Sequence, residues 1–172
     1  MKGRIIHPPR NFRGRPTTDM AKEALFNILA NRIEFSEISI LDLFSGSGNI
    51  SFEFASRGCR NITCVEKDFY HYRFIKQTIA SFGFPITAIH GDAIHFLEKV
   101  PGKYDLIFAD PPFNLPDLNK LPDLIIDGQV LNEKGILILE HPKEHNFTKI
   151  PQFSEVRQYG HVNFSFFKQS PD

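Results

Sequence analysis

A stiff acidic motif, Asp110-Pro111-Pro112-Phe113, follows a predicted strand and is the segment best suited to chemistry. Two consecutive prolines fix their φ angles and cannot continue a helix or a strand ladder, so the loop is rigid. Asp110 and the carbonyl of Pro111 can accept hydrogen bonds from an amino group, while Phe113 can stack on a flat ring. The motif therefore predicts a site for a planar heteroaromatic amine.

Such an amine is a poor nucleophile because its lone pair is delocalised into the ring. Asp110 is placed to localise that pair and to stabilise the positive charge that develops as an N–C bond forms. A sulfonium methyl donor would lose its charge in the transfer, and no metal would be needed. The motif thus indicates methylation of an exocyclic amine, the alternative being a turn that only ends a strand.

The glycine-rich turn Asp42-Leu43-Phe44-Ser45-Gly46-Ser47-Gly48 is the second candidate site. Its glycines let the backbone approach a ligand, and Gly48 opens a helix whose free N–H groups suit an anionic group. Asp42 would repel a bare diphosphate but suits an amino-acid moiety, which carries an ammonium as well as a carboxylate. An ordinary tight turn is the alternative. Ser51 departs from the dinucleotide-binding fingerprint, which disfavours a nicotinamide-dependent dehydrogenase.

Two more acidic residues stand at the ends of predicted strands. Glu66 can accept hydrogen bonds from a ribose diol. Asp92, in His90-Gly91-Asp92-Ala93, can accept a hydrogen bond from an adenine amino group. Because the carboxyl ends of parallel strands meet in one crevice, these residues and the glycine turn predict a site for an adenosine joined to an amino acid.

The elements that must position these residues form an α/β pattern. Apolar spacing predicts helices over 17–32, 49–57, 68–82, 93–99 and 118–126, and strands over 38–44, 61–65, 86–89, 104–109 and 135–139. Apolar strands that alternate with helices are typical of a parallel sheet covered on both faces. Residues 153–168 alternate around Tyr159-Gly160 and predict a hairpin at the sheet edge. We expect a basic N-terminal arm, 1–16, and a single domain, 17–172.

Composition limits the possible partners. The 172 residues have no net charge, yet five basic residues and no acidic one precede Asp19, which leaves +5 on that segment and −5 on the rest. A globally basic nucleic-acid binder is thereby excluded, although arginines of the arm could reach RNA phosphates. The two cysteines lack metal-ligand spacing and favour a reduced compartment. We expect a cytoplasmic protein without metal, because no segment predicts a signal peptide or a membrane span.

The segment from Arg15 to Leu29 reads RPTTDMAKEALFNIL and resembles the RPT-x-D-x-x-[KR]-EALFN-[IL]-L signature of the RsmD-like ribosomal RNA (guanine-N2)-methyltransferases. The glycine turn and the Asp-Pro-Pro-Phe motif follow in that family's order. The resemblance covers nearly the whole chain and implies the three-layer, Rossmann-like fold of class I methyltransferases, with a mostly parallel seven-stranded sheet and an antiparallel C-terminal strand. It also implies methylation of the N2 amine of a guanine in 16S ribosomal RNA, free or in a small-subunit particle. We expect the protein to act as a monomer.

The same resemblance assigns roles to individual residues. S-adenosyl-L-methionine would be bound by Thr17, Asp42, Phe44, Gly46, Gly48, Glu66, Asp92 and Ala93, the target base by Asp110, Pro111, Pro112 and Phe113, and the RNA by Arg10, Arg13 and Arg15. Phe26 and Asn27 would complete the donor pocket. Met20 stands where the family often has arginine, and Phe113 lacks the hydroxyl of the usual tyrosine. An adenine-N6 methyltransferase on DNA or RNA, or a non-catalytic RNA-binding assembly factor, are the alternatives.

Overall fold

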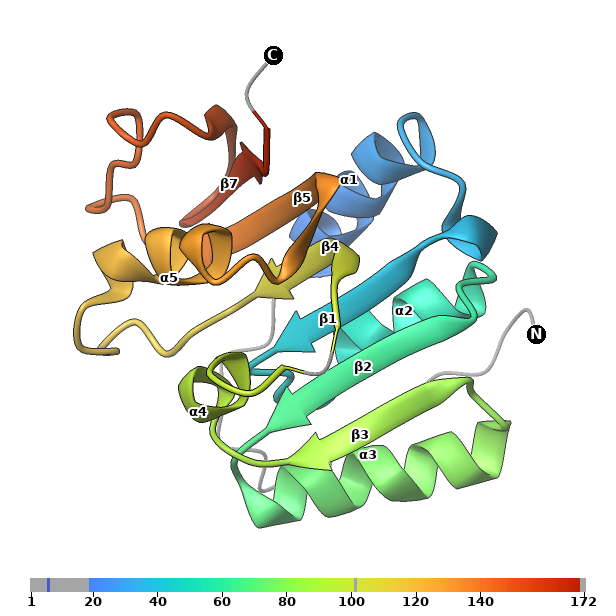
Figure 1. Cartoon of the computed structure of the whole chain (residues 1–172). Helices are drawn as coiled ribbons and strands as arrows, with labels where there is room; N and C mark the ends of the chain where they lie inside the picture. The colour runs from blue at the N-terminus through green and yellow to red at the C-terminus, as the bar shows by residue number, and fades with distance from the viewer. Residues whose placement is uncertain (1–5, 7–18, 101, 171–172) are drawn as a thin grey trace.

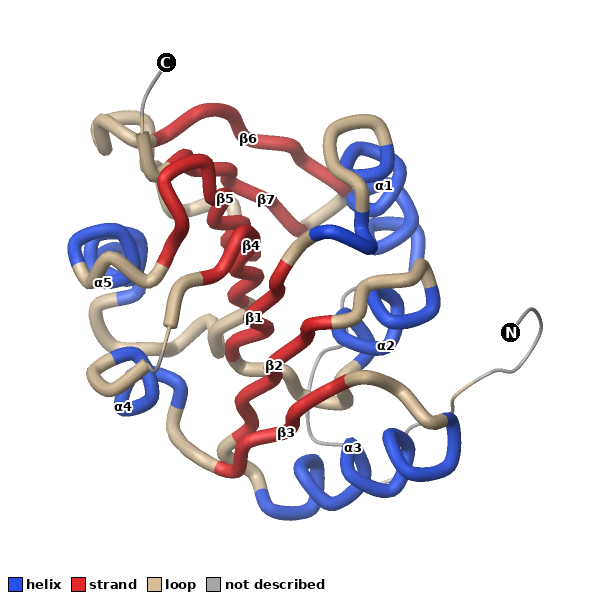
Figure 2. Tube along the Cα trace, turned by 45° about the vertical axis from the view of Figure 1, so that its right-hand side comes forward, coloured by secondary structure: helices blue, strands red, loops and turns tan. Residues whose placement is uncertain are grey.

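A seven-stranded sheet forms the centre of the computed structural model, which describes residue 6 and residues 19–100 and 102–170. The strand order is β3-β2-β1-β4-β5-β7-β6; Figure 1 labels the strands from β3 to β7, and Figure 2 also labels β6. The strands are β1 (Ser39–Leu43), β2 (Asn61–Glu66), β3 (Ile86–His90), β4 (Tyr104–Ala109), β5 (Leu131–His141), β6 (Phe153–Tyr159) and β7 (Val162–Lys168). The first five are parallel, and β7 lies antiparallel between β5 and β6. The predicted mostly parallel sheet with an antiparallel C-terminal strand is confirmed.

Helices cover both faces of this sheet, as Figure 2 shows. One face carries α1 (Asp19–Ala30), α2 (Asn49–Ser56) and α3 (Phe69–Phe82), and the other carries α4 (Ala93–Leu97) and α5 (Leu121–Asp127). Each face has its own apolar core, because successive strand residues point to opposite sides of the sheet. Within the described ranges, no helix has the length and apolar character needed to cross a bilayer.

The helices begin and end where local chemistry favours it. Asp68 caps α3, since its carboxylate accepts hydrogen bonds from the N–H groups of Tyr70 and His71. Gly83 ends the same helix at a φ of 65°. In α1, Ala21, Leu25 and Leu29 recur every four residues and are buried against the sheet. These local signals explain why the sequence predicts the helices well.

Two boundaries differ from the prediction by more than two residues. Strand β5 begins at Leu131 rather than at residue 135, because Leu131 pairs with Tyr104 ahead of an irregularity in the ladder. The helix predicted over 118–126 starts as a 3-10 turn, Leu118–Lys120, and becomes α-helical only from Leu121. The hairpin is confirmed, with Tyr159 opposite Val162 and Gly160 at a φ of 62°.

The order of the strands fixes where a ligand can bind. Strands β2 and β3 follow β1 on one side, whereas the chain crosses to the other side to place β4 next to β1. The carboxyl ends of β1 and β4 therefore flank the point at which the strand order reverses. Open α/β sheets bind their ligands in the crevice at this point.

Candidate active site

A cavity of about 850 Å³ opens at the carboxyl ends of the parallel strands. The turn after β1 contributes Phe44 and Gly46 to its wall, and β2 contributes Glu66. Opposite them lies the motif 110–113 after β4, all four residues of which line the cavity. The glycine turn and the rigid acidic loop, predicted separately, thus face one shared space. Arg10, Arg13, Arg15 and Thr17 lie outside the described residues.

Asp42, the fourth residue of β1, lies at the bottom of this cavity and is 1% exposed. Burial raises the pKa of its carboxyl to about 7, although hydrogen bonds from Ser51 act in the opposite direction. The hydroxyl of Ser51 donates to Oδ2 of Asp42 at 2.6 Å. The residue that breaks the dinucleotide fingerprint is therefore a direct partner of Asp42, and sequence reasoning missed this role.

The turn after β1 is held in an unusual backbone conformation. Phe44 has a φ of 61°, in the left-handed region that residues other than glycine seldom adopt. The side chain of Ser45 donates to the carbonyl of Asp42 at 2.7 Å, and its N–H donates to the carbonyl of Val65 at 3.0 Å. These bonds tie the turn to β1 and β2 and hold the strained residue at the cavity wall.

Gly48 belongs to the same turn, but it is not among the described residues that line the cavity. It precedes α2 with a φ of 76°, and a Cβ added to it would lie 2.9 Å from Cζ of Phe52 and 3.0 Å from Cγ1 of Ile75. The absence of a side chain thus permits both the left-handed turn and the close packing of α2 against α3. Its contribution to a ligand is indirect, through the position of the turn.

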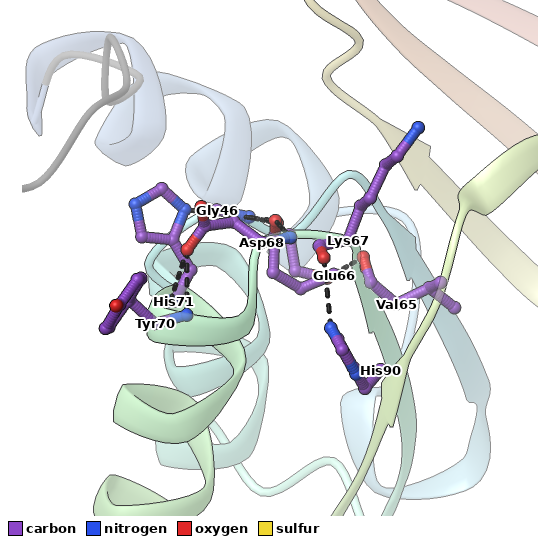
Figure 3. Close-up of polar contacts among 9 residues, drawn as sticks. Gly46, Val65, Glu66, Lys67, Asp68, Tyr70, His71 and His90 are labelled. Atoms are coloured by element: carbon purple, nitrogen blue, oxygen red, sulfur yellow. Dashed lines mark hydrogen bonds and ion pairs between the residues drawn. The ribbon is translucent and has the colours of Figure 1, made fainter.

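Glu66 ends β2 with its carboxylate held by the backbone (Figure 3). Oε2 accepts a hydrogen bond from the N–H of Gly46 and Oε1 accepts one from the N–H of Asp68, each at 2.7 Å. Nδ1 of His71 lies 3.8 Å from Oε1. Burial raises the pKa of Glu66, and the two N–H groups oppose that rise. A carboxylate has about four acceptor positions, so this fixed group can still accept from the hydroxyls of a ribose.

Asp92 follows β3, and its two carboxylate oxygens accept hydrogen bonds from different partners, the start of a helix and a lysine. Oδ1 accepts hydrogen bonds from the N–H groups of Ile94 and His95 at 3.0 and 3.2 Å and so caps α4. Oδ2 accepts from Nζ of Lys67 at 2.9 Å, and this bond lowers the pKa of Asp92. Sequence reasoning missed Lys67, whose carbonyl is also bonded to Nε2 of His90 at 3.1 Å (Figure 3).

Asp110 stands directly after β4, and its N–H donates to the carbonyl of Leu43 at 3.4 Å. Burial raises the pKa of its carboxyl well above the usual value, and the nearby charges of Glu140 and Asp42 raise it further. A buried carboxylate of this kind is a stronger base than one in water. Phe113, at the outer part of the same wall, is 40% exposed and presents an aromatic ring to the opening.

Glu140 is an acidic residue that sequence reasoning missed. It is 3% exposed, lies near the end of β5 and lines the cavity. The available signal was its position directly after the predicted strand 135–139, the same kind of position that Glu66 and Asp110 occupy. The prediction for Phe26 was wrong, since its ring packs in the core 4.6 Å from that of Phe54.

Among the residues that the structure describes, no group of three or more His, Cys, Asp or Glu side chains could hold a metal ion. Cys59 and Cys64 are both buried free thiols.

Known proteins resemble this chain in sequence and in fold. The family described as "Conserved hypothetical protein 95" matches residues 1–168. A "Putative rRNA methyltransferase YlbH" of Bacillus subtilis is 32% identical over 148 residues, which cover 83% of this chain and 79% of that protein. A "Ribosomal RNA small subunit methyltransferase D" of Buchnera aphidicola is 33% identical over 135 residues, covering 77% and 67%. Among solved structures, a "Putative methyltransferase yhhF" of Escherichia coli superposes with a TM-score of 0.80 at 25% identity, over 92% of this chain and 89% of that one.

Proposed function

This chain belongs to the RsmD-like family described as Conserved hypothetical protein 95, and we propose that it methylates the N2 amine of a guanine in small-subunit ribosomal RNA, with S-adenosylmethionine as donor. The observation that carries the proposal is the single cavity shared by the glycine turn and the Asp110–Phe113 loop. A methyl group can pass directly from donor to acceptor only if both are bound in one space. The names of the relatives support ribosomal RNA as the substrate.

The polar groups of the cavity fit the parts of S-adenosylmethionine. Asp42 offers a carboxylate to the ammonium of the methionine part, and Glu66 offers held oxygens to the ribose hydroxyls. Asp92 and Ala93 border the space where the adenine would lie. When bound, this donor supplies a methyl group on a sulfonium, whose sulfur takes the electron pair of the broken C–S bond. The residues present therefore suit the group, and every one of these carboxylates favours a cation nearby.

Asp110 acts on the base that receives the methyl group. Its carboxylate accepts a hydrogen bond from the N2 amine, which localises the nitrogen lone pair for the new N–C bond. The nitrogen becomes positively charged as that bond forms and then gives one proton to Asp110. The high pKa of the buried carboxyl suits it to take this proton. Pro111 and Pro112 keep the acceptor oxygens in place, and Phe113 stacks on the base.

The basic segment supplies the attraction to RNA in this proposal. Arg10, Arg13 and Arg15 contact phosphates around the target nucleotide, as an arm that precedes the domain over 17–172. A base within folded RNA must leave its stack before Phe113 can cover it, which costs a few kcal/mol. We therefore expect an accessible loop nucleotide to be the target, in free RNA or in a small-subunit particle, and the enzyme to act as a monomer.

The test is incubation of the purified protein with tritiated S-adenosylmethionine and with small subunits, or their RNA, from a strain that lacks the gene. The expected product is N2-methylguanosine in the digested RNA. Labelled N6-methyladenosine instead would assign the enzyme to adenine and overturn the choice of base. Absence of S-adenosylmethionine binding in calorimetry would overturn the enzymatic function and favour a non-catalytic assembly factor.

A further inference from the structure

Asp110 and Pro111 account for the amino group of the target but not for the choice of base, because adenine and guanine both carry an exocyclic amine. What differs is the neighbouring ring nitrogen. In guanine, N1 carries a hydrogen and donates, whereas in adenine the N1 next to the amine is an acceptor. A group that reads this difference must lie beside Asp110 and must accept hydrogen bonds only.

Glu140 occupies that place in the sheet. Ala109 of β4 is paired with Leu139 of β5, so the next residues on the two strands, Asp110 and Glu140, are neighbours in the parallel register. Adjacent strands lie about 4.8 Å apart, which allows two carboxylates to meet adjacent donors on one base edge. Both residues line the cavity, and Glu140 is 3% exposed.

The pairing of the strands also determines the face of the sheet to which Glu140 points. Asp42 is paired with Phe108, and Phe108 with Ile138, so these residues share one face of the sheet. Glu140 comes two residues after Ile138 and therefore points to that same face. Its antiparallel neighbour in the sheet is Phe164 of β7. The backbone of Glu140 is thus fixed within the sheet, which suits a group that must discriminate between bases.

We propose that Glu140 selects guanine by accepting the hydrogen bond of N1–H while Asp110 accepts that of the N2 amine. This inference rests on the proposed methylation of guanine N2. In its ionised form Glu140 can only accept, so the N1 of adenine would place one lone pair against another. Sites that bind a donor in this way reject an analogue that lacks it, because two hydrogen-bond acceptors then face each other.

The test uses RNA in which the methylated guanine, once mapped by mass spectrometry, is replaced by 2-aminopurine. That base keeps the N2 amine, but its N1 is an acceptor. We expect the wild-type protein to prefer guanine over 2-aminopurine in kcat/KM by about ten- to hundredfold. In Glu140→Gln, the amide can donate to the acceptor N1, so the preference should fall to about threefold or less. Glu133→Gln, an exposed position on the same strand, is the matched control and should keep the wild-type preference.

Binding of S-adenosylmethionine by Glu140→Gln, measured by calorimetry, should stay within about twofold of the wild-type value, which separates base selection from loss of the fold. A Glu140→Gln protein that binds the donor and keeps the wild-type preference would overturn the inference alone. A wild-type protein that accepts 2-aminopurine as well as guanine would do the same without any variant. Failure of the wild-type protein to methylate guanine would instead overturn the proposed function, and with it this inference.

Discussion

The buried carboxyl of Asp42 should make the binding of S-adenosylmethionine depend on pH. Its pKa is raised from 3.8 to about 7 by burial, so the side chain is largely protonated in the free protein at pH 5. The ammonium of the donor needs the ionised form. Each pH unit below 7 should therefore weaken binding about tenfold, which gives about a hundredfold loss at pH 5.

The variant Asp42→Asn shows whether this one group is responsible. A protonated aspartate and an asparagine are both neutral and of similar shape, so the two proteins should bind the donor about equally at pH 5. At pH 7.5 the wild-type protein should bind about ten- to hundredfold more tightly, the range of a hydrogen bond between charged groups. Glu66 and Asp110 are present in both proteins, so the difference between the two isolates Asp42.

Calorimetric titration at pH 5, 6, 7 and 7.5 measures this, with S-adenosylhomocysteine as a second ligand that keeps the ammonium. Ser51→Ala removes the 2.6 Å hydrogen bond that favours the ionised carboxylate, so the midpoint of the wild-type curve should move upward by about one pH unit. A wild-type affinity that stays flat from pH 5 to 7, or a pH slope retained in Asp42→Asn, would refute the assigned contact.

The raised pKa of Asp42 also affects the stability of the protein without ligand. Between pH 3.8 and about 7 the folded protein holds a proton that the unfolded chain releases, so the contribution of Asp42 to stability falls as the pH rises through this window. At pH 8, where Asp42 is ionised, the cost reaches about 4 kcal/mol. Chemical unfolding at pH 8 should therefore find Asp42→Asn more stable than the wild-type protein, whereas the two should be similar near pH 4.

Three other substitutions test the remaining parts of the site. Asp110→Ala should lower kcat by about two to three orders of magnitude with the donor Kd nearly unchanged, and substantial residual turnover would contradict its role. Gly48→Ala should destabilise the fold by about 1–3 kcal/mol in urea unfolding, because the new Cβ meets the ring of Phe52 at 2.9 Å and the residue keeps a φ of 76°. Phe113→Ala should raise KM for RNA by about five- to hundredfold through loss of stacking, and an equal loss of donor affinity would count against that contact.

Much of the fold could be predicted because its signals are local. The buried stripe of α1, the Asp68 cap and the Tyr159-Gly160 turn each lie within a few residues of sequence. The start of β5 at Leu131 could not be predicted in the same way, since it depends on pairing with Tyr104, a residue far away in the chain. Local patterns thus determine which elements form, while partner strands determine where some of them begin.

The candidate site also has features that the sequence predicts and features that it does not. The strand-end rule predicts that Asp42, Glu66, Asp92 and Asp110 gather at one edge of the sheet, and the cavity brings them together. The sequence does not show which of these carboxylate oxygens already accept hydrogen bonds from other groups of the protein. Asp92 is shared between a helix cap and Lys67, a residue 25 positions earlier, and such long-range bonds appear only when the strands are placed side by side.

The proposed function also gives a role to the unbalanced positive charge at the start of the sequence. In the proposed function Asp42 attracts the ammonium of the donor, but the acidic side chains of the cavity also repel RNA phosphates. The residues from Asp19 onward carry −5 and cannot compensate, whereas the eighteen before it carry +5. That segment joins α1, whose Lys22 donates to Oδ1 of Asn49 at 2.9 Å in the cavity wall. Under the proposed function, separate parts of the sequence would therefore supply the attraction for the cationic donor and for the anionic RNA.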